Sequence, residues 1–307
     1  MIEFFTALAD PDNEFLRLAF MVGMLASISF GIIGTYIVTR RISYIAGAIA
    51  HCVFGGIGAG LFLRNKVGLT WIDPMHGALA AALLAAVIIG LVSLYAHQRE
   101  DTVIGALWAV GMAAGLLFID LTPGYYNLAS YLFGDILLIS KSDLWLVLVL
   151  DGVVAALSIY FYNTLLGVCF DHEFSRLRGV QVGPFYILLL CLTALTVVLL
   201  VRVVGIVMVI ALLTLPAAVA GQFSRRLWQM MILATLFCMA FTWAGLSISY
   251  SYSLSSGPTI IMVAGGSYLL VILGRKIVLI GKRRPGGRRP EPQNPRRQSP
   301  RGQSASR

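Results

Sequence analysis

Long apolar runs separated by short polar breaks are the dominant pattern of this chain. They cover about residues 16–38, 44–63, 77–96, 103–119, 144–166, 185–201, 203–220, 227–248 and 258–274. A helix of about 20 apolar residues crosses the hydrocarbon core of a bilayer. The pattern therefore predicts an all-α, polytopic helical membrane protein with nine spans, or eight if the two runs around Arg202 form one broken element.

One further apolar run, residues 128–140, is shorter than the others. It follows the turn-rich segment 121–127, which contains Pro123 and Gly124. At about 13 residues it is too short for a simple span and suits a re-entrant or interfacial segment.

Composition supports a membrane location and places the positive charge at the C-terminus. Hydrophobic residues make up 58% and charged residues 12% of the chain, whereas soluble domains carry roughly 25% charged residues. The formal net charge is +9, but residues 275–307 alone carry +10 and the remainder carries −1. A nucleic-acid-binding body is therefore not supported.

Three regions and one orientation follow from these patterns. We expect residues 1–15 to form an extracytoplasmic N-terminal segment, residues 16–275 the transmembrane domain, and residues 276–307 a disordered basic cytoplasmic tail. Lys and Arg in short loops concentrate on the cytoplasmic side. With the N-terminus outside, that side receives the tail and Arg40, Arg41, Arg99, Arg176, Arg178, Arg225 and Arg226.

Few ionisable residues lie within the apolar region, and each is a functional candidate because lipid burial of such a group is expensive. They are His51, Asp135, Asp151 and Arg202. His51 is the strongest candidate, since neutral imidazole binds Zn, Mn or Fe ions. Its alternative role is structural, with a carbonyl of a neighbouring helix as partner. Asp135 suits a helix cap, and Asp151 either lines a polar interior or pairs with Arg202.

Glycines of the second run constrain the surroundings of His51. Gly47, His51, Gly55 and Gly58 are spaced i, i+4, i+8 and i+11, so they share one helix face. Small residues on such a face let helix backbones approach closely in lipid. His51 is therefore expected in a tight helix–helix seam or beside a narrow cavity.

Other polar residues and motifs narrow the possible functions. His76 follows Asp73 and Pro74 at the start of a run and is predicted to be interfacial. The 4 cysteines show no CxxC spacing and are predicted to be hydrophobic fillers rather than disulfides or metal ligands. The chain contains no GxxxxGK[ST] loop for ATP and no HExxH or GxSxG motif, so no enzyme activity of its own is predicted.

Short strings in a fixed order along about residues 15–275 form a recognisable set. They are Arg40-Arg41-Ile-Ser43 with His51 and Gly55-Gly56; Asp101-Thr-Val-Ile-Gly105 with Gly111-Met-Ala-Ala-Gly115; Leu132-Phe-Gly-Asp-Ile-Leu137; Phe170-Asp171 with Glu173-Phe174 and Gly179; Val204-Gly205, Ala211-Leu-Leu213, Pro216-Ala-Ala218 and Ala220; and Ser256-Gly257-Pro258. As an ordered set they resemble the permease subunits of the zinc/manganese/iron ABC importers, and the tail lies outside the resemblance.

This resemblance implies a permease that carries a divalent transition metal ion by alternating access in a dimer. The implied partners are a cytoplasmic ABC ATPase subunit, an extracytoplasmic metal-binding solute-binding protein and a second permease protomer in the plasma (inner) membrane of a prokaryote. The metal is substrate, ATP binds the ATPase, and no cofactor is held permanently. The implied ATPase-coupling residues are Asp171, Glu173, Phe174 and Gly179.

The chain departs from the family pattern at Gly47, where the family carries a carboxylate four residues before the histidine. Either Asp151 or a group of the second protomer replaces that ligand, or the ion passes with little coordination, or the cargo is a metal chelate. Two other classes stay open. A secondary transporter or channel for a metal ion or chelate would show inverted repeats; the other class is a non-transport membrane scaffold or enzyme.

Overall fold

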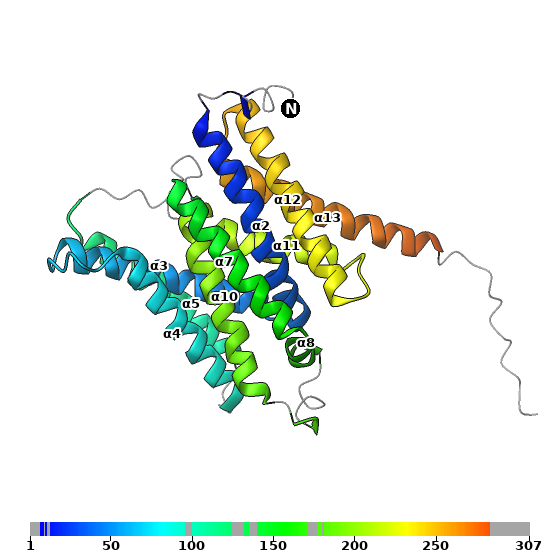
Figure 1. The fold of residues 1–307 in the computed structure, drawn as a ribbon, viewed down its shortest axis with the longest axis horizontal. Helices are drawn as coiled ribbons and strands as arrows, with labels where there is room; N and C mark the ends of the chain where they lie inside the picture. Colours follow the sequence, from blue (N-terminus) through cyan, green and yellow to red (C-terminus); the bar gives the residue numbers. More distant parts are fainter. Residues whose placement is uncertain are drawn as a thin grey trace, which may run out of the picture. The chain divides into compact units, whose positions relative to one another are not determined.

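Helices make up most of the part of the chain that the computed structural model describes, namely residues 7–8, 10, 13–95, 100–124, 132–134, 140–170, 177–179 and 181–282. The helices in these ranges are α2 (Glu14–Arg40), α3 (Ser43–Asn65), α4 (Pro74–Tyr95), α5 (Glu100–Asp120), α7 (Lys141–Tyr160), α8 (Tyr162–Phe170), α10 (Val182–Val204), α11 (Ile206–Ala220), α12 (Leu227–Tyr252) and α13 (Ser256–Lys282) (Figure 1). Eight of these helices are long and apolar enough to cross a membrane. The predicted all-α, multi-pass architecture is confirmed.

The structure differs from the predicted runs within residues 144–166 and at the end of the last run. The run 144–166 is two helices, because the chain turns at Phe161, with φ −97° and ψ 15°, between α7 and α8. The last helix continues beyond residue 275 and ends at Lys282. The short run 128–140 lies largely outside the described residues.

The break that the sequence placed near Arg202 falls at Gly205. This residue separates α10 from α11 and has φ 83° and ψ 161°, a backbone conformation that is essentially restricted to glycine. The helix that follows, α11, has 15 residues, which corresponds to about 22 Å against a hydrocarbon core of about 30 Å. Most of its side chains are buried by protein, so its length need not match the bilayer.

Helix α3 lies in the interior of the compact unit that extends to Leu270. It packs between α4 and α5, while α2 packs against α7, α11 and α12, and α10 contacts α3, α4, α7 and α11 (Figure 1). Within its apolar stretch, 89% of α3 is buried, whereas the corresponding value for α5 is 17%. The chain thus buries the helix that carries His51 and leaves one side of the adjacent α5 uncovered.

Candidate functional site

The glycine face of α3 forms the seam with α5, as the spacing predicted. A Cβ atom added to Gly55 would lie 2.7 Å from the carbonyl oxygen of Gly111, and one added to Gly58 would lie 2.6 Å from that of Gly115. These distances are shorter than any ordinary van der Waals contact, so only glycine fits. The two helix backbones therefore touch directly, and the register of α5 along α3 is fixed.

His51 lies in this seam and is almost completely enclosed. The residue is 8% exposed, and its ring stacks on the indole of Trp108 with 4.7 Å between ring centroids and 27° between planes. Its Nδ1 atom is buried without a hydrogen-bond partner in the described part of the protein. A structural histidine held at Nδ1 by a neighbouring carbonyl is therefore not what the structure contains. A buried, unpartnered imidazole nitrogen is suited to bind a metal ion.

Trp108 occupies the position where a side chain at residue 47 would lie. A Cβ atom added to Gly47 would be 2.5 Å from Cζ3 and 2.6 Å from Cη2 of the indole. The adjacent helix backbone is held in place as well, because the Cys52 thiol donates to the carbonyl of Leu107 at 3.4 Å. The carboxylate missing at Gly47 thus has no room in this structure. Trp108 was not predicted from the sequence; its signal was the i, i+3, i+7 spacing with Gly111 and Gly115 on α5.

Asp151 lies in a different seam from His51. It is buried on α7, where one carboxylate oxygen accepts a hydrogen bond from the Ser29 hydroxyl of α2 and the other, Oδ2, has no partner among the described residues. No three His, Cys, Asp or Glu side chains in the described ranges come together as a metal site. The structure therefore gives no support for Asp151 as the replacement ligand beside His51. The predicted pairing with Arg202 involves a side chain outside the described set.

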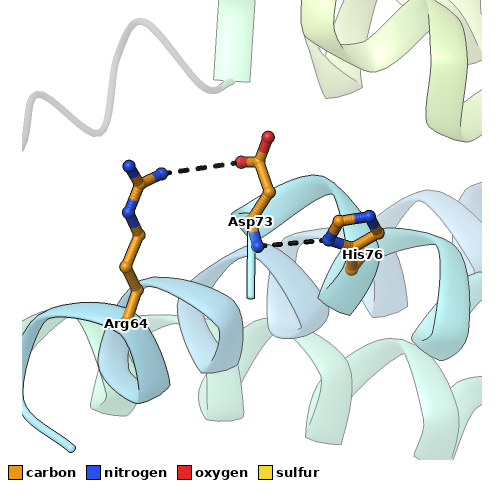
Figure 2. A network of polar contacts seen from close by, with 3 residues as sticks. All are labelled: Arg64, Asp73 and His76. Atoms are coloured by element: carbon orange, nitrogen blue, oxygen red, sulfur yellow. Dashed lines mark hydrogen bonds and ion pairs between the residues drawn. The ribbon is translucent and has the colours of Figure 1, made fainter. Parts of the chain in front are cut away.

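His76 has a local structural role at the start of α4 (Figure 2), and its predicted interfacial position stays a prediction. Its Nδ1 accepts a hydrogen bond of 3.1 Å from the backbone N–H of Asp73, whose carboxylate lies 4.0 Å from Arg64. The carboxylate and guanidinium side chains are both about half exposed, so the ion pair contributes roughly 1 kcal/mol or less. The contacts fix the connection between α3 and α4 and do not involve His51.

Most of the implied ATPase-coupling residues lie outside the described ranges. Asp171, Glu173 and Phe174 are not described. Asp135, the candidate helix cap, is not described either. Gly179 is described and has φ 80°, with no atom of the described residues within 4 Å of an added Cβ. Immediately before this segment, the Arg40 guanidinium donates to the carbonyl of Val168 at 2.9 Å. The end of α2 thereby holds the last turn of α8, which directly precedes the residues predicted to couple to an ATPase.

All cysteines are free, as the absence of paired spacing predicted. Cys52, Cys169 and Cys238 are buried, and Cys191 is partly buried. Cys52 is next to His51 in sequence but uses its thiol for the bond to Leu107. The cysteines therefore serve mainly in packing.

Comparisons with known proteins agree with the set of strings found in the sequence. The model of the ABC 3 transport family matches residues 12–275. A membrane protein of Synechocystis sp., slr2045, is 42% identical over 86% of this chain and 92% of its own length. The manganese transport system membrane protein MntC of Halalkalibacterium halodurans is 32% identical over 84% of this chain and 86% of its own length.

A solved structure matches the fold over most of the chain. PsaBC from Streptococcus pneumoniae, in complex with Fab, superposes with a TM-score of 0.77 at 28% sequence identity, covering 89% of this chain and 95% of the matched chain. The chain therefore belongs to the ABC 3 transport family and is a membrane-spanning permease of the metal-ion ABC importer type.

Proposed function

We propose that this chain is the permease subunit of an ATP-driven importer that carries a divalent transition metal ion past His51. It functions as a dimer with a second permease protomer, and alternating access opens the path to each side of the membrane in turn. A cytoplasmic ABC ATPase drives the cycle, and an extracytoplasmic solute-binding protein delivers the metal. The plasma membrane of a prokaryote holds the assembly.

The observation that carries this proposal is the enclosed imidazole of His51. It lies on the most deeply buried stretch among the candidate spans, and its Nδ1 lacks any hydrogen-bond partner in the described residues. A polar group left in this state costs about 1–3 kcal/mol. That free-energy cost is offset when a passing cation accepts the nitrogen lone pair. A transport role therefore explains the unpaired Nδ1 better than a packing role does.

The uncovered side of α5 supports a second protomer beside the path. Val110 and Leu117 are large apolar residues of α5 with 65% and 62% exposure. Since the opposite side of α5 forms the seam with His51, a partner that covers α5 would also enclose the path. This placement favours a dimer in which the path lies close to the protomer contact.

The orientation follows from counting α11 as a crossing. Arg40 and Arg41 at the end of α2 and Arg225 and Arg226 before α12 then fall on the same side of the membrane. That side is the cytoplasm by the distribution of positive residues. The segment around Gly179 faces the ATPase under this topology, as coupling requires.

Metal uptake by the reconstituted assembly tests the function. Proteoliposomes with the permease, its ATPase and ATP should accumulate at least one of Zn²⁺, Mn²⁺ and Fe²⁺, and an ATPase variant that cannot hydrolyse ATP should abolish accumulation. Uptake that persists without ATP and collapses when a proton gradient is dissipated would contradict the proposal. That result would favour the alternative, a secondary transporter or channel for the metal ion or a metal chelate.

Substitution of Gly179 by alanine should uncouple ATP hydrolysis from uptake. An L side chain at φ 80° costs about 1–2 kcal/mol. Because no atom of the described residues lies within 4 Å of the added Cβ, we expect the change to act through the backbone of this segment. We expect uptake per ATP hydrolysed to fall about fivefold or more, a change of roughly 1 kcal/mol in coupling. Parallel measurement of phosphate release and metal uptake checks the ratio.

A matched control is Gly68→Ala. Gly68 also has a positive φ, 85°, and no atom within 4 Å of an added Cβ, but it lies in the α3–α4 connection on the predicted extracytoplasmic side. Its uptake per ATP should stay at the parent value. If uptake per ATP hydrolysed is the same for Gly179→Ala and the parent, Gly179 has no role in coupling.

A further inference from the structure

The side chain of Trp108 lies against two consecutive positions of the glycine face on α3, residues 47 and 51. The Trp108 indole fills the side-chain space of Gly47 and stacks on the ring of His51. Gly47 and His51 are one helical turn apart on the same face. A single side chain from α5 therefore excludes any ligand at position 47 and fixes the plane of the ligand at position 51.

We propose that Trp108 is a positioning residue that determines metal specificity by presenting His51 as a lone imidazole ligand. This inference rests on the proposed function, since it assumes that a cation passes His51. Imidazole nitrogen favours Zn²⁺ and Fe²⁺, whereas carboxylate oxygen favours Mn²⁺ and Mg²⁺. By occupying the room of a carboxylate, the indole shifts the path toward metals that prefer nitrogen.

The stacked geometry also stabilises the metal-bound state of the ring. An imidazole that holds a divalent cation carries partial positive charge, and the face of an indole attracts positive charge. At 4.7 Å and 27° the two rings are close and nearly parallel. The stack thus restricts rotation of His51 and stabilises the ion-bound imidazole.

The position of the indole is fixed by backbone contacts on either side of it. The Cys52 thiol bonds the carbonyl of Leu107, the residue before Trp108. One turn further along α5, a Cβ added to Gly111 would lie 2.9 Å from the Cα and N atoms of Cys52. Because α5 cannot slide along α3, the indole leaves its place only by a change of its own side-chain torsions. The side chain that fits at position 47 consequently depends on the side chain at position 108.

Uptake kinetics of four variants in the full permease–ATPase complex test the inference. Trp108→Ala should raise the KM for Zn²⁺ about tenfold while the maximal rate changes less than about twofold, and Trp108→Phe should restore the parent KM because it keeps a stacked ring. Gly47→Asp alone should abolish either assembly of the permease or metal uptake by it, since the new side chain meets the indole. Gly47→Asp combined with Trp108→Ala should transport, with a Mn²⁺:Zn²⁺ uptake ratio about tenfold above that of Trp108→Ala.

The matched control is Trp145→Ala, because Trp145 is an exposed tryptophan of α7, 67% accessible and remote from His51 in the helix packing. It should leave both KM and the metal ratio unchanged. Parent-level uptake by Gly47→Asp alone, or an equal loss of Zn²⁺ and Mn²⁺ uptake in Trp108→Ala without rescue by phenylalanine, would overturn the inference. If the double variant does not assemble, the comparison of KM between Trp108→Ala and Trp108→Phe decides. Absence of ATP-driven metal uptake by the parent itself would instead overturn the proposed function.

Discussion

His51→Ala should reduce ATP-driven metal uptake to the level of vesicles that lack the permease. In the described part of the chain the imidazole is not joined by two further metal-ligating side chains, so its loss leaves the ion without its protein nitrogen ligand. Loss of even an outer partner of a metal ligand costs about 10–100-fold, and loss of the ligand itself should cost at least about 100-fold. Uptake of each metal by reconstituted vesicles measures this loss.

The amount of assembled permease should not change in this variant. The stack on Trp108 contributes about 0.5–1.5 kcal/mol, whereas removal of the unpartnered Nδ1 relieves a cost of similar size. These contributions nearly cancel, so elution in detergent and the yield from membranes should match the parent. A transport defect without an assembly defect is therefore the specific expectation.

Two companion variants separate a role in the path from a general effect of losing a histidine. His76→Ala removes a histidine that bonds the backbone of Asp73 in the α3–α4 connection (Figure 2), and should retain uptake. His51→Gln keeps a polar side chain of similar reach but lacks the imidazole ligand, and should behave as His51→Ala does. Full uptake by His51→Ala would exclude His51 from the route of the ion.

The transmembrane elements and the seam of His51 were accessible from the sequence because both depend on local spacing. The predicted second run, residues 44–63, corresponds to α3 at Ser43–Asn65. Glycines at i, i+8 and i+11, with His51 at i+4, favour a close neighbouring helix whatever the rest of the fold. The spacing therefore identified the face of α3 that packs, and with it the enclosed position of His51.

The identity of the neighbouring groups was not accessible in the same way. A stripe on α3 does not say which helix covers it, so the indole of Trp108 was missed although it lies directly on Gly47. The same limit applies to Asp151, a candidate replacement ligand that lies in the α2–α7 seam with Ser29. Contacts between distant segments depend on the whole packing arrangement, which one sequence leaves open.

Breaks within apolar stretches were located only approximately. The sequence marked Arg202 as the centre of a break, whereas the helix ends at Val204 and resumes at Ile206. The turn at Phe161 carried no Gly or Pro signal and was not predicted. Gly205 accounts for the observed position of the break, because its backbone conformation is one that an L residue rarely adopts.

Gly205→Ala should have the largest effect on stability among single alanine substitutions of glycine. Two independent costs coincide at this residue. Its φ of 83° with ψ of 161° strains any L residue by about 1–3 kcal/mol. In addition, an added Cβ would lie 2.8 Å from the carbonyl oxygen of Leu132 and closer still to the backbone of Phe133 and Gly134.

The contact at Gly205 joins segments that are far apart in the chain. The described residues Leu132 to Gly134 lie against the α10–α11 break, and Gly134 itself has φ 73° with an added Cβ 2.8 Å from the nitrogen of Gly205. Both partners are backbone, so neither gives way by a side-chain rotation. Overpacking of this kind typically costs about 1–3 kcal/mol, in addition to the torsional strain. The total approaches the whole stability of a marginal protein, about 5–15 kcal/mol.

Four alanine variants separate the two costs at Gly205. Gly68→Ala adds a side chain at φ 85° without a contact, Gly55→Ala adds a contact at 2.7 Å within a regular helix, and Gly152→Ala adds neither. Thermal unfolding of the purified permease in detergent should rank Gly205→Ala lowest, by about 10 °C or more, and Gly152→Ala at or slightly above the parent because alanine favours helix. A Gly205→Ala variant as stable as Gly68→Ala would show that the backbone of residues 132–134 does not press on the break. The loss of stability in Gly205→Ala should exceed the loss in Gly68→Ala or in Gly55→Ala. The reason is that Gly205→Ala introduces both torsional strain and a close backbone contact.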